Sequence, residues 1–407
     1  MSKIRVLATP SDTHGVGKYR IIDPFTYIKN KFTDEFYVDI NSEIPVSDLF
    51  FKKYDIVFFH SFIHKTTHED NINRIKWLQK NNIKTIMDID DYWAVDQRHP
   101  MFRHINEMGI NKKKIEMLQL VDFVTTTTPY FADTIKKKLQ VKNIHVFPNA
   151  IDPEESQFIP NKTQSDRTRF GWLGGSSHLY DLELLKNGIA RILDNHKDSV
   201  QFVLCGFDTR GSIQMYDKTT KKNTIRQIKP EETVWFKYEH IFTNNFKFIN
   251  EDYKRFLLQF VDAPYNNNQS YIRRWTRDIN TYATNYNHFD VSLAPLVDTV
   301  FNNNKSELKI IESGFHRKPV IASDIIPYKG VLKNAFEQGK FIPDGNALLI
   351  PPNKNHKLWD ICMKTFINNP NFIKDLGERL YETVKDKYSL PNVCKDRVEF
   401  IKVIINN

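Results

Sequence analysis

The chain has 407 residues, which is too long for one ordinary hydrophobic core, so we expect two domains. Hydrophobic residues make up 40% of the sequence and charged residues 26%, as in soluble globular proteins, and no stretch approaches the roughly 18 uninterrupted apolar residues of a membrane span. The formal charge of +9 suits an anionic partner such as nucleic acid, an acidic glycan or a membrane surface, although a Lys- and Asn-rich composition produces the same charge without one.

Short apolar runs alternate with helical spacing through the first 152 residues. Ile72, Ile75 and Leu78 have the spacing of a helix, and residues 112–139 are typical of a helix, a strand, a threonine-rich turn and a second helix. Further strands are expected at residues 3–9, 53–61, 83–93 and 144–152. Alternating strands and helices predict a parallel sheet covered on both faces.

Residues 153–167 are polar and without periodicity, which predicts a linker. A second alternating series occupies residues 168–384, interrupted by an insertion rich in aromatic and basic residues at about 208–287. The sequence therefore predicts an α/β protein with two Rossmann-like, doubly wound parallel-sheet domains, 1–152 and 168–384. We expect ligands to bind beyond the carboxyl ends of the strands, in a cleft between the domains.

The turn "THGVGKYR" follows the first strand and precedes a helix. Gly15 and Gly17 would let the backbone approach a ligand, and a helix N-terminus favours an anion. The spacing is neither G-x-G-x-x-G nor that of a Walker A loop, and a tight structural turn explains it equally well.

Three aspartates, Asp88, Asp90 and Asp91, end the strand predicted at residues 83–93. Carboxylates at a strand end can recognise hydroxyls, act as a general base or bind a metal ion. An N-cap role for Asp91 is the structural alternative. No second cluster completes a metal site in the sequence, so we expect no metal.

A second glycine turn, Gly174 and Gly175, lies between a predicted strand and a predicted helix. Ser176, Ser177 and the next helix N-terminus would offer hydrogen-bond donors, which favours an anion-binding loop.

The segment "KSELKIIESGFHRKPVIAS" predicts a helix before a buried strand. Lys305, Lys309, Glu312 and His316 are spaced by four, three and four residues, which would place them on one helix face. Ser306 could cap that helix. Two lysines near a helix start oppose its macrodipole, and a bound diphosphate would reverse that penalty. A solvated face is the alternative.

The histidines, among them His60 and His104, are scattered and are interpreted as structural. The run "RRWTR" from Arg273 to Arg277 could contact phosphates or bases, and a surface loop is the alternative.

Several segments together resemble a known family. They are "VFPNAID", "FGWLGGSSHLYDL", "FDVSLAPL", "FNNNKSELKIIESGFHRKPVIAS" and "DGNALLIPP". The chain is similar to glycosyltransferase family 4, whose members have the GT-B fold and use nucleotide sugars. The specific part of the resemblance is the string from Lys305 to Ser323. The family motif of a glutamate, seven residues and a second glutamate begins here at Asn304 instead.

The resemblance implies roles for individual residues. Glu312 would hold the ribose hydroxyls of the donor, and Lys305, Ser306 and Lys309 would face the diphosphate or the sugar. Gly15, Gly17, Gly174 and Gly175, with Ser176, would border the phosphates. The final helix, at about 385–407, would pack back on the first domain. Asp90 and Asp91 are expected to contact the acceptor or the sugar, and with Lys309 they are the predicted catalytic residues.

These expectations describe a retaining glycosyltransferase that moves a sugar from a nucleotide-diphosphate donor to a hydroxyl of a glycan, a lipid-linked sugar or another acceptor. We expect it to use no cofactor, since the nucleotide sugar is a substrate. One alternative is a glycosyltransferase that acts on modified bases of viral DNA, which the basic charge favours. A second is a non-catalytic nucleotide- or glycan-binding protein, which Asn304 favours.

The expected location is the cytoplasm, with a membrane surface or an infected host cell as alternatives. The first residues lack the apolar core of a secretory signal. The cysteines, Cys205, Cys362 and Cys394, are few and widely spaced, which indicates a reducing compartment rather than a disulfide framework or a zinc site.

Overall fold

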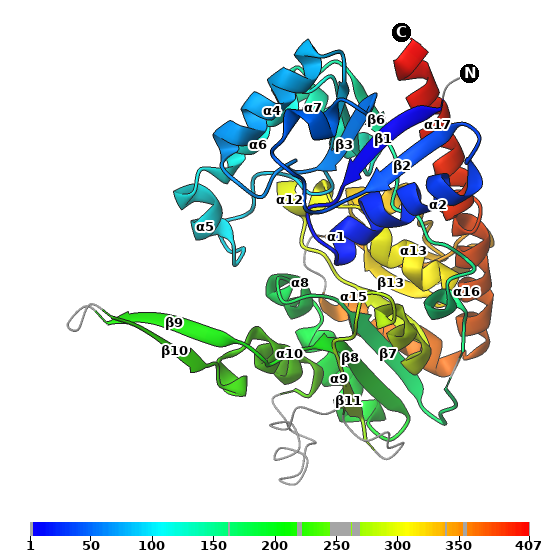
Figure 1. Cartoon of the computed structure of the whole chain (residues 1–407). Coiled ribbons are helices and arrows are strands. Elements are labelled where there is room, and N and C mark those ends of the chain that lie inside the picture. The colour runs from blue at the N-terminus through cyan, green and yellow to red at the C-terminus, as the bar shows by residue number, and fades with distance from the viewer. Residues whose placement is uncertain are drawn as a thin grey trace. The chain divides into compact units, whose positions relative to one another are not determined.

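A computed structural model describes residues 3–161, 163–217, 222–244, 262, 269–337, 340–352 and 356–406 (Figure 1). Contacts between Cα atoms divide the chain into two compact units. Unit 1 comprises residues 1–155, 298–311 and 383–407, and unit 2 comprises residues 156–297 and 312–382. No described helix is both long enough and apolar enough to span a membrane.

Unit 1 is built on a six-stranded sheet in the order β2-β1-β3-β4-β5-β6, in which every neighbouring pair is parallel. Its strands are β1 (Ile4–Thr9), β2 (Phe36–Ile40), β3 (Ile56–His60), β4 (Lys84–Asp88), β5 (Phe123–Thr126) and β6 (Ile144–Val146). Its main helices are α2 (Asp23–Lys31), α4 (His68–Lys80), α6 (Ile110–Leu120), α7 (Pro129–Leu139) and α17 (Leu390–Asn406). Shorter helices are α1 (Gly15–Gly17), the π-helix η1 (Lys18–Ile22), α3 (Asp48–Phe51), α5 (Phe102–Glu107) and α12 (Val300–Asn303).

Alternate residues of β3 supply two apolar cores, one on each face of this sheet. Val57 and Phe59 belong to the core under α4, α6 and α7, whereas Ile56 and Phe58 belong to the core under α2 and α17. Every residue of β3 is buried, because side chains that point to either face of a covered parallel sheet meet helices.

Unit 2 has a second six-stranded sheet, in the order β11-β8-β7-β12-β13-β16, also with parallel neighbours. Its strands are β7 (Thr168–Leu173), β8 (Val200–Phe207), β11 (Tyr271–Trp275), β12 (Val291–Ala294), β13 (Val320–Ser323) and β16 (Leu348–Ile350). Two small antiparallel pairs are β9 (Ser212–Asp217) with β10 (Lys222–Gln227) and β14 (Phe336–Glu337) with β15 (Lys340–Phe341). The β9–β10 ribbon extends away from the rest of unit 2 (Figure 1).

The helices of this part of the chain complete the alternation. They are α8 (Leu179–Glu183), α9 (Lys186–His196), α10 (Val234–Phe242), α14 (Ile326–Lys329), α15 (His356–Asn368) and α16 (Asn371–Val384), with the 3₁₀ turns η2 (Ser156–Phe158), η3 (Pro230–Glu232) and η4 (Tyr282–His288). Helix α13 (Leu308–Phe315) contains the boundary between the two units.

The predicted fold class, two doubly wound parallel sheets, is confirmed. The sequence analysis missed β2, an edge strand whose second residue, Tyr37, is exposed. The predicted insertion at about 208–287 contains β9, β10, α10 and β11, and its residues 218–221, 245–261 and 263–268 lie outside the described part of the chain.

A buried ion pair lies at the carboxyl end of β4. Arg20 Nε donates to Asp88 Oδ2 (2.8 Å) and Arg20 Nη2 donates to Asp88 Oδ1 (2.7 Å), and both residues are at most 1% exposed. The Thr125 hydroxyl donates to the same carboxylate (2.5 Å). Burial alone would raise the pKa of Asp88, but Arg20 holds it below its ordinary value. Asp88 is therefore a structural carboxylate rather than a site residue.

Replacing Asp88 by Ala should destabilise unit 1 by about 3–5 kcal/mol, because it leaves the Arg20 charge buried without its partner. Hydrogen exchange of peptides from β4 and β5, measured in the intact chain, reports the free energy of local opening. The control Asp34→Ala, at an exposed position, should change it by less than about 0.5 kcal/mol. Unchanged protection of β4 in Asp88→Ala would show that the pair is not needed.

Candidate functional site

The carboxyl ends of β1, β3 and β4 bring four polar side chains into one hydrogen-bonded row. The Ser11 hydroxyl donates to Asp12 Oδ2 (2.9 Å) and lies 2.7 Å from His60 Nδ1. His60 Nε2 lies 2.9 Å from Asp90 Oδ1. Both ring nitrogens of His60 thus lie within hydrogen-bond distance of a side-chain oxygen, one of Ser11 and one of Asp90.

The predicted glycine turn is attached to the same row. Asp12 Oδ1 accepts hydrogen bonds from the backbone N–H of His14 (2.8 Å) and of Gly17 (3.2 Å). A Cβ at Gly17 would lie 1.8 Å from the Asp12 carbonyl oxygen, so only glycine allows the chain to fold this tightly. Gly15 begins α1 inside this turn. Hydrogen bonds thus connect the turn to Asp90 through Ser11 and His60.

Asp90 and Asp91 are adjacent, but their surroundings move their pKa values in opposite directions. Burial alone would raise the pKa of Asp90, but His60 lowers it below its ordinary value. Burial and the Asp90 charge raise the pKa of Asp91, against an opposing effect of Lys305. Two neighbouring carboxyl groups with divergent pKa values are typical of sites in which one stays ionised and the other exchanges a proton.

The loop before α13 is held to unit 1 by the Pro-Asn turn that follows β6. Arg20 Nη1 donates to the Phe147 carbonyl (2.6 Å) and to Asn149 Oδ1 (3.2 Å). Asn149 Nδ2 in turn donates to the Ser306 hydroxyl oxygen (3.0 Å). The guanidinium that binds Asp88 therefore also orients the amide that contacts Ser306.

The same loop carries a buried carboxyl that the sequence analysis missed. Glu307 is 6% exposed, and its Oε1 accepts a hydrogen bond from the Tyr388 hydroxyl (2.8 Å). Burial raises its pKa. Glu307 Oε2 and the neighbouring Asn304 Oδ1 are both buried and have no hydrogen-bond partner within the described part of the chain.

The four polar residues of the predicted helix face do not share a helix. Helix α13 begins at Leu308, and Lys305 lies in the loop before it, where its N–H donates to the Asn302 carbonyl (3.2 Å). The Lys305 ammonium lies over the Phe301 ring, 4.7 Å from its centroid. Of the predicted set, Lys309 and Glu312 lie within α13, three residues apart. Lys309 is half-buried and Glu312 is buried.

The remaining member of that face, His316, is not a charged ligand group. It is 1% exposed and stacks on the Tyr286 ring at 5.0 Å and 16°. Burial, with a smaller effect of Lys318, lowers its pKa to about 3, so the imidazole is neutral at physiological pH. The Tyr286 hydroxyl donates to Glu312 Oε2 (3.0 Å), which fixes that carboxylate.

In unit 2 the second glycine turn follows β7. A Cβ at Gly174 would lie 2.5 Å from the Trp172 ring, which explains the glycine. The Tyr238 hydroxyl donates to the Gly175 carbonyl (3.3 Å) and accepts from the His178 N–H (2.8 Å). Gly175 and Ser176 are exposed, so their polar groups can reach a ligand.

The first three residues of the "RRWTR" run belong to the edge strand β11, and Thr276 and Arg277 follow it as an exposed segment. Arg273 is fully buried, lies over the Phe207 ring at 4.2 Å and is 3.8 Å from Glu239. Arg274 lies 3.5 Å from Asp262. Arg273 and Arg274 thus lie near carboxylates of unit 2, whereas Arg277 is exposed.

Ser11, Asp12 and Arg20 were not predicted from the sequence, and His60 was interpreted as structural. Ser11 and Asp12 follow β1 closely, and His60 is the last residue of β3. Their positions at strand ends were the available signal. Within the described residues, no three acidic, histidine or cysteine side chains are grouped as metal ligands.

Comparison with known proteins identifies the fold. No protein-family model and no curated protein matches the sequence. Among solved structures, the chain is similar over its full length to a glycosyltransferase from Rickettsia africae, with 13% identity, 100% coverage of both chains and a TM-score of 0.59. It is also similar to Anabaena HepE in complex with UDP and glucose, with 10% identity, coverage of 98% of this chain and 100% of that chain, and a TM-score of 0.60.

A third similar structure is Staphylococcus aureus TarM in complex with UDP, with 13% identity, coverage of 92% of this chain and 57% of TarM, and a TM-score of 0.52. These proteins share the two-sheet GT-B fold of glycosyltransferases, and the chain has that fold.

His316→Phe should make the stability of unit 2 less sensitive to acid. The low pKa of the buried histidine contributes stability that is present above the unfolded-state pKa of about 6.5 and is lost as the pH falls toward 3. Between pH 7 and pH 5 the parent should lose about 2 kcal/mol more than the variant. Hydrogen exchange of β12 and β13 peptides measures this difference.

The matched control is His196→Phe, at the end of α9, which should keep the parental pH dependence. Parallel pH profiles for His316→Phe and the parent would contradict a neutral, buried His316.

Proposed function

We infer that the protein is a glycosyltransferase that uses a nucleotide-diphosphate sugar, within or close to glycosyltransferase family 4. The observation that carries this proposal is the arrangement of charged residues around the start of α13. The half-buried Lys305 lies in the loop before this helix, and the helix itself contains Lys309 and, three residues later, the buried Glu312. Full-length similarity to HepE, whose structure contains UDP and glucose, supports a UDP-sugar donor.

Several of the predicted donor residues have a defined role in this proposal. Lys305 and Lys309 bind the diphosphate, whose negative charge offsets the cost of two cations near a helix start. Glu312, oriented by Tyr286, accepts hydrogen bonds from the ribose hydroxyls. The exposed backbone of Gly175 and the Ser176 hydroxyl contact the donor phosphates.

Transfer breaks the bond between the anomeric carbon and the diphosphate oxygen and forms a bond from that carbon to the acceptor oxygen. The hydroxyl proton of the acceptor is released together with the nucleotide diphosphate. Fixed cations stabilise the departing diphosphate without reorganisation. Asp90 stays ionised beside His60, and Asp91 accepts a hydrogen bond from a hydroxyl of the acceptor or sugar.

We further expect retention of the anomeric configuration, which NMR of the first-formed product tests directly.

Lys309→Ala and Glu312→Gln should each lower kcat/KM for nucleotide release from a UDP-sugar by about 10- to 100-fold, because each removes a charge-assisted hydrogen bond to the donor. UDP release measured with several UDP-sugars provides the readout. Lys374→Ala, on the exposed surface of α16, serves as the control and should keep full activity. Parental activity in both site variants would place the donor elsewhere.

Asp91→Asn should lower kcat by about 100-fold or more while leaving the affinity for UDP unchanged, because the carboxyl acts on a reacting hydroxyl rather than on the nucleotide. Initial rates and UDP titration calorimetry separate the two quantities. The control Asp386→Asn, at an exposed position, should have no effect. A variant that loses UDP affinity but retains kcat would refute this role.

A further inference from the structure

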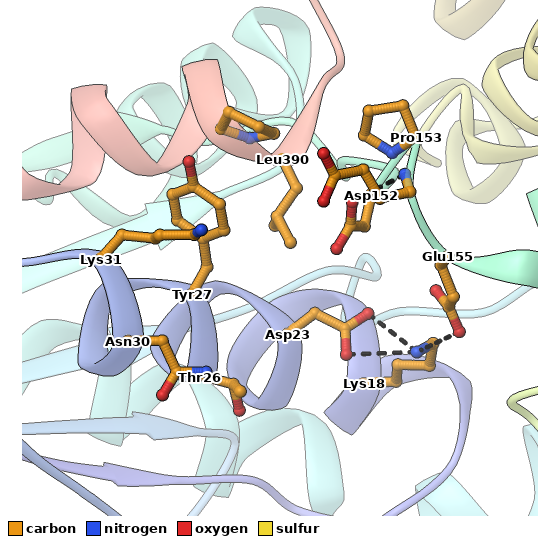
Figure 2. A pocket seen from close by; sticks show the side chains of 12 residues that line it. Lys18, Asp23, Thr26, Tyr27, Asn30, Lys31, Asp152, Pro153, Glu155 and Leu390 are labelled. Atoms are coloured by element: carbon orange, nitrogen blue, oxygen red, sulfur yellow. Dashed lines mark hydrogen bonds and ion pairs between the residues drawn. The ribbon is translucent and has the colours of Figure 1, made fainter.

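A separate cavity lies in unit 1 beside α2. It has a volume of about 310 Å³ and is formed by η1, α2, residues 152–155 and the first residues of α17. Figure 2 shows that the side chains of Asp23, Tyr27 and Lys18 approach it from one side, and those of Asp152 and Leu390 from the other. This volume suits a ligand of the size of a monosaccharide.

One cation of the cavity is already neutralised by the protein. Lys18 is 6% exposed, and its ammonium lies 3.1 Å from Asp23 Oδ2 and 2.9 Å from Glu155 Oε1 (Figure 2). Burial raises the pKa of Asp23 to about 6; Lys18 opposes this, and the nearby Glu155 and Asp152 charges add to it. Three carboxyl groups, those of Asp23, Glu155 and Asp152, therefore lie near the single ammonium group of Lys18.

Two further carboxylates line the cavity, Asp152 and Glu154. Neither has a cation within salt-bridge distance among the described residues, and the Asp152 carboxylate accepts a hydrogen bond from the Glu154 N–H (3.0 Å). Four carboxyl groups thus face two ammonium groups, since the only other basic residue of the lining is the exposed Lys31. The excess of negative charge favours a cationic ligand.

The other walls of the cavity are apolar. The Tyr27 ring, the buried Leu390 and two prolines, Pro153 and Pro391, provide them. Thr26 and Asn30 add neutral hydrogen-bonding groups. A hydrated inorganic ion would gain nothing from the apolar walls, and the lining acids are not grouped as metal ligands. An organic ligand that carries both an amine and hydroxyl groups matches the carboxylates, the apolar walls and the neutral hydrogen-bonding groups of the lining.

We propose that this cavity is a binding site for a small hydroxylated organic amine of the amino-sugar class. Its ammonium group binds Asp152 and Glu154, its apolar ring face packs on Tyr27 and Leu390, and its hydroxyls reach Thr26 and Asn30. The site is distinct from the donor-binding residues, and binding there does not require that the protein transfer a sugar.

Titration calorimetry of the full chain with glucosamine at pH 7 tests the proposal, with glucose as the uncharged probe of the same ring. Glucosamine should bind saturably and at least about tenfold more tightly than glucose, because only the amine gains a charge-assisted hydrogen bond. The double variant Asp152→Asn/Glu154→Gln, which keeps side-chain size, should weaken glucosamine binding by about tenfold or more.

The matched control Glu43→Gln, at an exposed position, and Lys309→Ala, in the donor set, should both bind glucosamine like the parent. Excess UDP should not displace the amine, which separates this site from the donor site whether or not glycosyl transfer is observed. The proposal is overturned by equal affinity for glucose, by unchanged binding in the double variant, by competition with UDP, or by no saturable binding of glucosamine.

Discussion

The arrangement of unit 1 depends on one buried guanidinium, that of Arg20. It binds Asp88 at the end of β4, the Phe147 carbonyl after β6 and the Asn149 amide that contacts Ser306. Removing a charge from water costs several kcal/mol, and a pair regains this only when its remaining hydrogen bonds are made. Here a bidentate carboxylate and two further acceptors satisfy the guanidinium. The pair therefore fixes the positions of three chain segments relative to one another, which hydrophobic packing alone would leave less specific.

The ion pair between Arg20 and Asp88 also determines the surroundings of Asp90 and Asp91, the two aspartates that follow β4. Asp88 is held by Arg20, so the chain that leaves β4 presents Asp90 to His60 and Asp91 to the Lys305 side of the loop. Opposite surroundings then give adjacent carboxyl groups opposite pKa shifts. The row from Asp90 through His60 and Ser11 to Asp12 also connects this charge pattern to the glycine turn. The position of Asp90 is therefore linked to that of the turn backbone through side-chain contacts alone.

Most of the fold could be predicted from the sequence, because the covered parallel strands are rich in apolar residues and the helices between them have helical spacing. The site was harder to predict. Arg20 occupies a helical segment in which an arginine is usually solvated, and only the end of a distant strand shows why it is buried. Lys305 has the spacing of a helix face, but a local turn in which Asn304 Nδ2 donates to the Val300 carbonyl ends α12 and delays α13. His316 also has the spacing of that predicted polar face, but in the structure it is buried and stacks on the Tyr286 ring.

Net charge alone does not locate a ligand site in this chain, for a physical reason. Several of the arginines that contribute to the formal charge of +9 are internal: Arg169 binds Asp290, and Arg397 lies over the Phe147 ring, where burial and then Arg20 lower its pKa to about 10. Such buried charges interact mainly with neighbouring groups in the interior and contribute little to the electrostatic potential at the protein surface. The cavity beside α2 is instead lined by an excess of carboxylates within a basic protein. Local geometry, rather than the total charge, therefore decides which ligand each surface of this molecule attracts.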